Sequence, residues 1–292
     1  MTSILFDAPG PRARSRNVVL SVVTALVVLA IIGFIILRFT ESGQFTAAKW
    51  KIFTFPLVQQ TIVSSIGVTL QAFAAAAVGS LLFGVILAFG RLSDHRWISL
   101  PCYWVTELLR AVPVLIMMMI LYYGLPPLGV HGITPFTAVV VALIAYNGSV
   151  LAEVFRAGIE SLPKGQKEAG FAIGLSKGKV QRLILLPQAV RAMLPVIIAQ
   201  LVVILKDTAL GFIITFNEIL FQANYFGTQA QYGSPVLPAL MVAGATYIVL
   251  CLLLSGIAKW LEWRLRRGPK SLKTATPINL DMGAGAGLSA GS

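Results

Sequence analysis

Charged residues are scarce in this sequence. Asp, Glu, Lys and Arg make up only 12% of its 292 residues, whereas hydrophobic residues make up 57% and the mean hydropathy is +0.83. So few charges cannot supply the polar surface that a soluble domain of this length needs. The composition therefore predicts an all-α, polytopic membrane protein.

Histidine and cysteine are rarer still. Cys102 and Cys251 are the only cysteines, and both have apolar sequence neighbours, so no disulfide framework is implied. His95 and His131 are the only histidines, and they fall in predicted loops on opposite sides of the membrane. A histidine-based metal site or hydrolytic triad needs such side chains close together. We therefore expect no metal site, no catalytic residue and no cofactor in this chain.

A phosphate-binding loop is also missing. Residues 174–179 read GLSKGK, whereas the P-loop requires four residues between its glycines and a Ser or Thr after the Lys. Here only three residues separate Gly174 from Gly178, and Val180 follows Lys179. Energy from ATP must therefore arrive through another subunit.

Acidic residues are outnumbered by basic ones. The sequence has 11 Asp and Glu against 23 Lys and Arg, which gives a net charge of +12. All but four of the basic residues fall in segments expected near the cytoplasm. The exceptions are Arg38, Lys49, Lys51 and Lys206. This positive-inside distribution indicates membrane topology, not a nucleic-acid partner.

Six apolar segments are long enough to cross a bilayer. They cover residues 18–37, 61–89, 100–123, 135–153, 194–221 and 236–260. A basic arm (1–17) precedes the first segment, which is longer than a secretory signal core and lacks an A-x-A cleavage site, so we expect an uncleaved span. Six spans place both termini in the cytoplasm. The Gly-, Ala- and Ser-rich tail (266–292) is expected to be disordered.

Small residues recur at every fourth position in the second span. They are Ala72, Ala76, Ser80, Gly84 and Ala88. On a helix these positions form one ridge, and small residues let membrane helices approach each other closely. The ridge predicts a tight helix–helix contact.

Two acid–base pairs stand three residues apart near the inner ends of their spans. They are Glu107–Arg110 in the third span and Glu153–Arg156 in the fourth. Residues at this spacing are neighbours on a helix and can form ion pairs. We expect both pairs to act as structural locks at an inner gate; the alternative is that they are substrate ligands. Pro113 follows the first pair and is expected to kink the helix or to begin its membrane-buried part.

Polar residues inside the spans mark a candidate substrate path. Lys206 and Asp207 lie past the middle of the fifth span, where charges are costly and usually face a bundle interior or a wet cavity. Lys206 suits a substrate carboxylate; the alternatives are a structural network between helices or a side chain that reaches outward to the interface. Asn147 either binds substrate or bridges helices, and Tyr146 is a further candidate.

The segment from Glu168 to Pro187 is the most informative. It reads EAGFAIGLSKGKVQRLILLP, and its charges argue against a membrane crossing. In its first half, tiny residues mix with Phe171, Ile173 and Leu175, which suits a short helix laid into a partner's pocket. An ordinary amphipathic loop is the alternative. Pro187 is expected to stop the segment before the next span.

The spacing in this segment resembles the signature loop of ABC-importer permeases, in which E-A-A is followed by a Gly four residues later and then by I-x-L-P. The matching positions are Glu168, Ala169, Gly174, Ile184, Leu186 and Pro187. Gly170 stands where the family usually has Ala, and we expect it to loosen the helix slightly. Further segments resemble the polar amino-acid uptake subfamily, most of all actinobacterial glutamate-uptake permeases. These segments are 107–113, 153–159, 165–169 and 205–208.

This resemblance implies a five-helix permease core at residues 57–265, to which the span at 18–37 is additional. The loop at 157–191 would be a coupling loop that rests on a cytoplasmic ATPase and is not itself catalytic. The residues expected to couple to the ATPase are Glu168, Ala169, Gly170, Phe171, Gly174, Leu175, Leu186 and Pro187.

The resemblance also implies partners. Two cytoplasmic ATP-binding subunits would hold ATP-Mg, a second permease copy or paralogue would complete the pore, and an extracytoplasmic amino-acid-binding protein would deliver substrate. The chain would carry a polar amino acid, glutamate being the first choice, by alternating access across the cytoplasmic membrane. The alternative is a secondary transporter or channel that needs no ATPase and uses Lys206 and Asp207 for ion coupling. A membrane-embedded enzyme would need clustered catalytic residues, which the sequence lacks.

Overall fold

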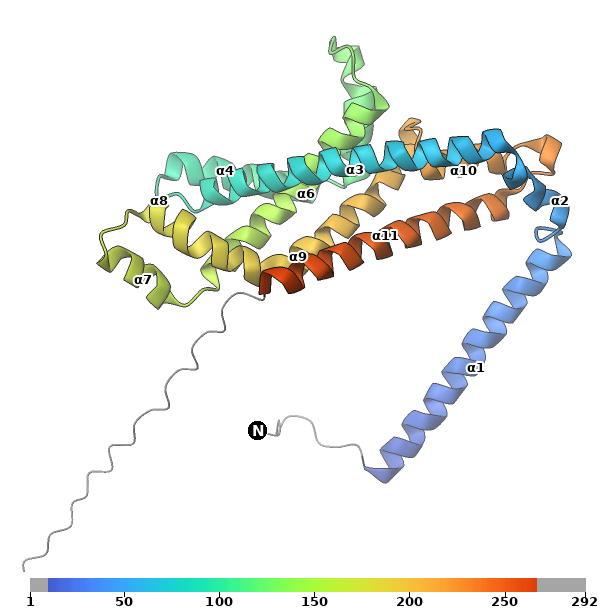
Figure 1. Cartoon of the computed structure of the whole chain (residues 1–292), viewed down its shortest axis with the longest axis horizontal. Coiled ribbons are helices and arrows are strands. Elements are labelled where there is room, and N and C mark those ends of the chain that lie inside the picture. The colour runs from blue at the N-terminus through green and yellow to red at the C-terminus, as the bar shows by residue number, and fades with distance from the viewer. Residues whose placement is uncertain (1–9, 267–292) are drawn as a thin grey trace, which may run out of the picture.

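The computed structural model describes residues 10–266, and within this range it is built from helices without strands (Figure 1). The expected all-α fold is confirmed. Most of the arm at 1–17 and the tail from 267 onward lie outside the described residues. The helices are α1 (Pro11–Glu41), α2 (Ala47–Trp50), η1 (Lys51–Thr54), α3 (Pro56–Arg91), α4 (Arg96–Ala111), α5 (Val114–Met119), the π-helix η2 (Ile120–Gly124), η3 (Pro126–Leu128), α6 (Pro135–Glu160), α7 (Lys164–Ala172), α8 (Lys177–Lys179), the π-helix η4 (Val180–Leu185), α9 (Leu186–Asp207), η5 (Thr208–Ile214), α10 (Ile219–Gly227), η6 (Ala230–Tyr232) and α11 (Val236–Arg266).

Five helices of the described chain are long and apolar enough to cross a membrane. They are α1, α3, α6, the continuous helix Lys177–Ile214 and α11. A sixth span results if α4 and Val114–Gly124, which are bent by 96° relative to each other, count as one broken span. The six predicted spans therefore all correspond to helical segments, and the third is the broken one.

The break in the third span lies at Val112 and Pro113. Val112 is extended (φ −86°, ψ 124°), as expected of a residue whose helical conformation is disfavoured by the following proline ring. The kink expected at Pro113 is therefore confirmed, and it is a sharp one. In Figure 1 the green segment after the break projects away from the bundle, nearly across the direction of α3.

The prediction that Pro187 stops the signature segment is wrong, and so is the fifth span's predicted start at residue 194. The helix begins at Lys177 and continues through Pro187 to Ile214. It changes from a π-helix to an α-helix at Leu186, so that Pro187 falls in the first turn of α9, where a missing N–H breaks no α-helical hydrogen bond. The helix also ends before the predicted residue 221, because Thr215 is left-handed (φ 62°).

The core forms where α3 packs along α6. All five residues of the small-residue ridge are buried, which confirms the predicted tight contact. A Cβ atom on Gly84 would lie 2.9 Å from Cβ of Leu151 and 3.0 Å from the carbonyl oxygen of Gly148, so only glycine fits there. The hydroxyl of Ser80 donates a hydrogen bond to the carbonyl of Leu143 (3.3 Å).

Helix α1 stands apart from this core. It has no buried residue, and Figure 1 shows it diverging from the bundle. The opposite end of the bundle carries α7, α8 and the start of α4, which lie together in Figure 1. We call this end, with the turn Ser93–His95, the α7 end; it holds the candidate site.

Candidate functional site

Helix α7 contains the first half of the signature segment and ends in a Schellman motif. Gly174 is left-handed (φ +79°), its N–H donates to the carbonyl of Phe171 (2.9 Å), and the N–H of Leu175 donates to the carbonyl of Gly170 (3.2 Å). Glycine adopts this conformation readily because it has no Cβ atom, which would clash with the backbone in other residues. The helix predicted in the loop is therefore present, and Gly174 terminates it.

Gly170 holds α7 close to the second half of the loop. The residue is buried, and a Cβ atom there would lie 2.8 Å from Cγ2 of Val180 and 2.9 Å from Cδ1 of Ile184. The glycine therefore permits a close approach between α7 and η4, in addition to its low helix propensity. Leu175, Val180 and Ile184 belong to one small apolar cluster beneath α7.

The exposed surface of α7 is partly apolar, and Phe171 lies at the cavity beneath the helix. Ile173 is 74% exposed and Phe171 is 41% exposed, while Glu168 and Ala169 are also exposed. The ammonium of Lys167 lies 5.9 Å from the centre of the Phe171 ring. Two bulky apolar side chains on a solvated helix indicate a surface that another protein covers.

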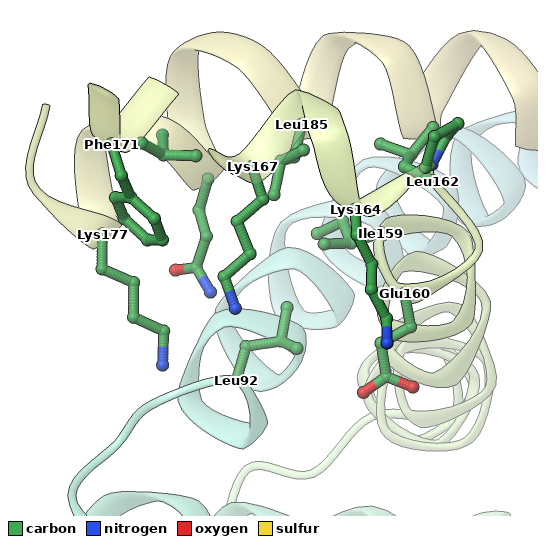
Figure 2. Close-up of a pocket in the computed structure, with 12 residues that line it drawn as sticks. Leu92, Ile159, Glu160, Leu162, Lys164, Lys167, Phe171, Lys177 and Leu185 are labelled. Atoms are coloured by element: carbon green, nitrogen blue, oxygen red, sulfur yellow. The ribbon is translucent and has the colours of Figure 1, made fainter. Parts of the chain in front are cut away.

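A cavity of about 270 Å³ lies between α7, the end of α6 and η4. Figure 2 shows Lys164, Lys167 and Lys177 extending into it above Leu92. Lys177 also binds Asp94 in the turn between α3 and α4. This hydrogen bond holds the pKa of the Asp94 carboxyl below its usual value. The Lys177–Asp94 ion pair thus links the signature loop to the turn between α3 and α4.

The two predicted ion pairs both form. In the first, Nη1 of Arg110 lies 3.5 Å from Oε1 of Glu107. In the second, Nη2 of Arg156 lies 2.5 Å from Oε1 of Glu153, and its Nε is 3.2 Å from both carboxylate oxygens. Glu160 pairs with the same arginine at 2.5 Å.

Sequence reasoning missed Arg91, which connects these two pairs. Its Nη1 lies 2.7 Å from Oε2 of Glu153 and 3.6 Å from Oε1 of Glu107, and its side chain is only 9% exposed. The guanidinium also lies 5.2 Å from the centre of the Tyr103 ring. Arg91 therefore links α3, α4 and α6 at one point. The signal was its position at the inner end of an apolar span.

The structure favours the bridging role for Asn147. The side chain is fully buried; it donates to the carbonyl of Leu143 (3.1 Å) and accepts a hydrogen bond from Nε2 of Gln200 (2.6 Å). The contact with Gln200 joins α6 to α9. Tyr146, its neighbour, instead lines a hollow with Glu107, Arg110 and Glu153.

Lys206 and Asp207 are the last two residues of α9. Lys206 is exposed and Asp207 is half-buried, and no ion pair joins the two side chains. Adjacent residues on a helix point in different directions, so this outcome was expected. Neither residue lines the hollow at Tyr146. The four predicted substrate-path residues are thus not gathered into one site.

Glu218 is a second residue that sequence reasoning missed. Its carboxylate is fully buried and accepts hydrogen bonds from the N–H groups of Leu220 and Phe221, both at 2.7 Å, and from the Tyr247 hydroxyl at 2.7 Å. It therefore caps α10 and fastens it to α11. An acidic residue directly before an apolar run was the available signal.

Comparison with known proteins gives a consistent result. Residues 80–267 match the family described as "Binding-protein-dependent transport system inner membrane component". The chain is 39% identical over 251 residues to the glutamate transport system permease protein GluD of Corynebacterium glutamicum, covering 83% of this chain and 89% of GluD. It is 34% identical over 209 residues to the arginine transport system permease protein ArtQ of Bacillus subtilis, covering 70% and 92%.

Solved structures agree on the fold. A chain of a crystal structure titled as an amino acid ABC transporter with histidines superposes with a TM-score of 0.63 at 28% identity, covering 70% of this chain and 94% of that one. A chain of the MetNI methionine ABC transporter in an inward-facing conformation superposes with a TM-score of 0.60 at 15% identity, covering 73% and 99%. The second likeness shows a shared fold.

Proposed function

The chain belongs to the family of binding-protein-dependent transport system inner membrane components, a multi-pass membrane subunit of ABC importers, and from this premise we propose that it carries a polar amino acid into the cell, driven by separate ATPase subunits. The exposed apolar residues Ile173 and Phe171 of the α7 region are the observation that carries the proposal, because they offer a soluble partner an apolar surface to cover.

The route from α7 to the membrane helices follows from the contacts at the α7 end. Gly170 seats α7 directly on η4, which runs without interruption into α9. Lys177 ties the same segment to Asp94 and so to α3 and α4. A displacement of α7 is therefore passed to three spans at once. We propose that ATP-driven closure of two ATPase subunits moves α7 in this way and alternates access to the substrate path.

In this scheme the ion pairs joined by Arg91 form the inner gate. The two Arg91 contacts hold α3, α4 and α6 together, and the Glu107–Arg110 pair lies next to the sharp break at Pro113. Rocking of these helices would separate or re-form the Arg91 contacts, since they cross between helices, whereas Glu107–Arg110 and Glu153–Arg156 each lie within one helix. No chemistry at this chain is required, because ATP-Mg would be held by the partner.

Glutamate is our first choice of substrate, supported by the 39% identity to GluD. The likeness to ArtQ, named for arginine, shows that related chains differ in substrate. An extracytoplasmic amino-acid-binding protein would deliver the substrate, and a second permease copy or paralogue would supply the second coupling helix for the second ATPase. Both termini would lie in the cytoplasm, on the α7 side of the membrane.

Reconstitution tests this proposal. The complex that co-purifies with this chain from native membranes is placed in proteoliposomes, and uptake of radiolabelled L-glutamate is measured with and without ATP and binding protein. We expect uptake only when ATP, ATPase and binding protein are all present. Uptake by the chain alone under an ion gradient would instead support a secondary transporter.

A further inference from the structure

A hollow of about 450 Å³ lies between α4 and α6, next to the helix break at Pro113. Its walls are formed by Glu107, Arg110, Ala111, Tyr146, Val150, Glu153 and Val154. Ligand pockets for small molecules typically have volumes of about 300–1,000 Å³, so the hollow has room for an amino acid. Irregular backbone at membrane depth is tolerated where it lines a cavity, and the break beside Ala111 meets that condition.

The charges around the hollow are unequally satisfied. Glu153 is hydrogen-bonded by Arg156, with its closest contact at 2.5 Å, and forms an ion pair with Arg91 at 2.7 Å in which Nη1 of Arg91 makes no hydrogen bond to any residue that the structure describes. Glu107, in contrast, has only two long contacts, at 3.6 Å to Arg91 and at 3.5 Å to Arg110. Close ion pairs have N–O distances of about 2.7–2.9 Å, so Glu107 and Arg110 are held loosely.

Arg110 has donors to spare. A guanidinium carries five N–H groups, and in the described chain this one has a single long contact to a carboxylate. The Tyr146 hydroxyl has no hydrogen-bond partner among the described residues. The hollow thus presents a cation, an anion and a phenol hydroxyl that are all available to a small ligand.

We propose that this hollow binds the amino acid itself, on the release side of the substrate path. The α-carboxylate lies on Arg110 in the forked arrangement that guanidinium groups favour, the α-ammonium faces Glu107, and the Tyr146 hydroxyl contacts the ligand between them. The loose Glu107–Arg110 pair closes the empty site and is replaced by the two charges of the ligand. This inference rests on the proposed function, and it makes two residues of the inner gate into ligand-binding residues.

Protection of an introduced cysteine tests the site directly. Cys102 and Cys251 are replaced by Ala in the intact co-purified complex, and Ala111→Cys is labelled with a charged maleimide. L-Glutamate, L-glutamine and L-arginine are the probes. The controls are glutarate, which lacks the α-ammonium, and 4-aminobutyrate, which lacks the α-carboxylate. We expect at least one of the amino acids to slow labelling, and both controls to fail. Leu57→Cys, at the other end of α3, is expected to show no protection.

Two variants link protection to the named residues. Arg110→Gln is expected to raise the half-protecting concentration about tenfold or more, equivalent to about 1.4 kcal/mol. Arg38→Gln, which breaks another three-residue Glu–Arg pair far from the hollow, is expected to leave it unchanged. Tyr146→Phe keeps the ring and gives a second measurement if Arg110→Gln does not fold.

The outcomes separate the two proposals. Absence of protection by all three amino acids, in a variant that still shows ATP-driven amino-acid uptake, would overturn the binding site and leave the proposed function standing. Equal protection in the chain without these substitutions, in Arg110→Gln and in Tyr146→Phe would also overturn the proposed binding site. Absence of ATP-driven uptake in the unmodified complex would contradict the proposed function itself.

Discussion

Gly170 and Val180 lie so close that a Cβ atom on the glycine would be 2.8 Å from Cγ2 of the valine. This contact joins the two halves of the signature loop. It packs α7 directly against the start of the helix that crosses the membrane, and in the proposed mechanism force on α7 would reach the spans through this contact.

Gly170→Ala is therefore expected to impair transport. Alanine raises helix propensity by about 1 kcal/mol over glycine, yet its methyl group must push α7 away from Val180 and Ile184. We expect unchanged expression and membrane insertion, and ATP hydrolysis that exceeds uptake. Gly165→Ala is the control in the same helix, because a Cβ atom there meets nothing within 4 Å. Equal coupling ratios in the two variants would contradict the close-packing role.

Gly174→Ala tests the end of α7. The left-handed conformation costs a non-glycine residue about 1–2 kcal/mol, so the Schellman motif should weaken and α7 should fray at its C-terminus. Hydrogen exchange of residues 170–175 is expected to speed up. Gly178→Ala, where φ is not positive and no atom lies within 4 Å of the added Cβ, should leave exchange unchanged. Identical exchange in both variants would argue against a required left-handed glycine.

Arg91→Met is expected to lower thermal stability. The substitution leaves Glu107 and Glu153 without their shared cation, and the loss of a partner for a charged, partly buried group costs about 1–3 kcal/mol. Arg38→Met removes one member of an exposed pair whose side chains are 68% and 64% exposed, and such pairs contribute about 0–1 kcal/mol. Melting of the detergent-purified protein measures both. A smaller shift for Arg91 than for Arg38 would refute the linking role.

A double-mutant cycle distinguishes a structural role of the Asn147–Gln200 hydrogen bond from a role of Asn147 in substrate binding. Asn147→Leu alone leaves the half-buried Gln200 amide without its partner, and we expect a loss of about 1–3 kcal/mol. Replacing both residues by Leu should recover part of this loss, since neither polar group then remains. If Asn147→Leu instead raises the KM for uptake at unchanged stability, the residue binds substrate.

Most of the architecture followed from local patterns. The four-residue ridge in α3 and the three-residue acid–base spacings are properties of a single helix, so they could be read before any packing was known. The effect of Pro187 could not be predicted in this way, because it depends on a π-helical turn that places the proline in the first turn of α9. Arg91 was missed for a related reason: Glu107 and Glu153 come from other helices, and only the folded chain brings them together with it. The contact of Glu218 with Tyr247 likewise depends on the fold, although its capping of α10 is local.

The central claim is that α7 inserts into a cytosolic ATPase subunit. The direct measurement uses Ile173→Cys, at the end of α7, in a chain whose Cys102 and Cys251 are replaced by Ala. Leu57→Cys, in α3, is the control, since both positions are 74% exposed. A short thiol–amine crosslinker is added to native membranes. We predict that position 173 crosslinks to a co-purifying ATPase and reacts only from the cytosolic side, whereas position 57 does neither. Labelling of position 173 from outside the cell, or only by lipid-soluble reagents, would contradict the account.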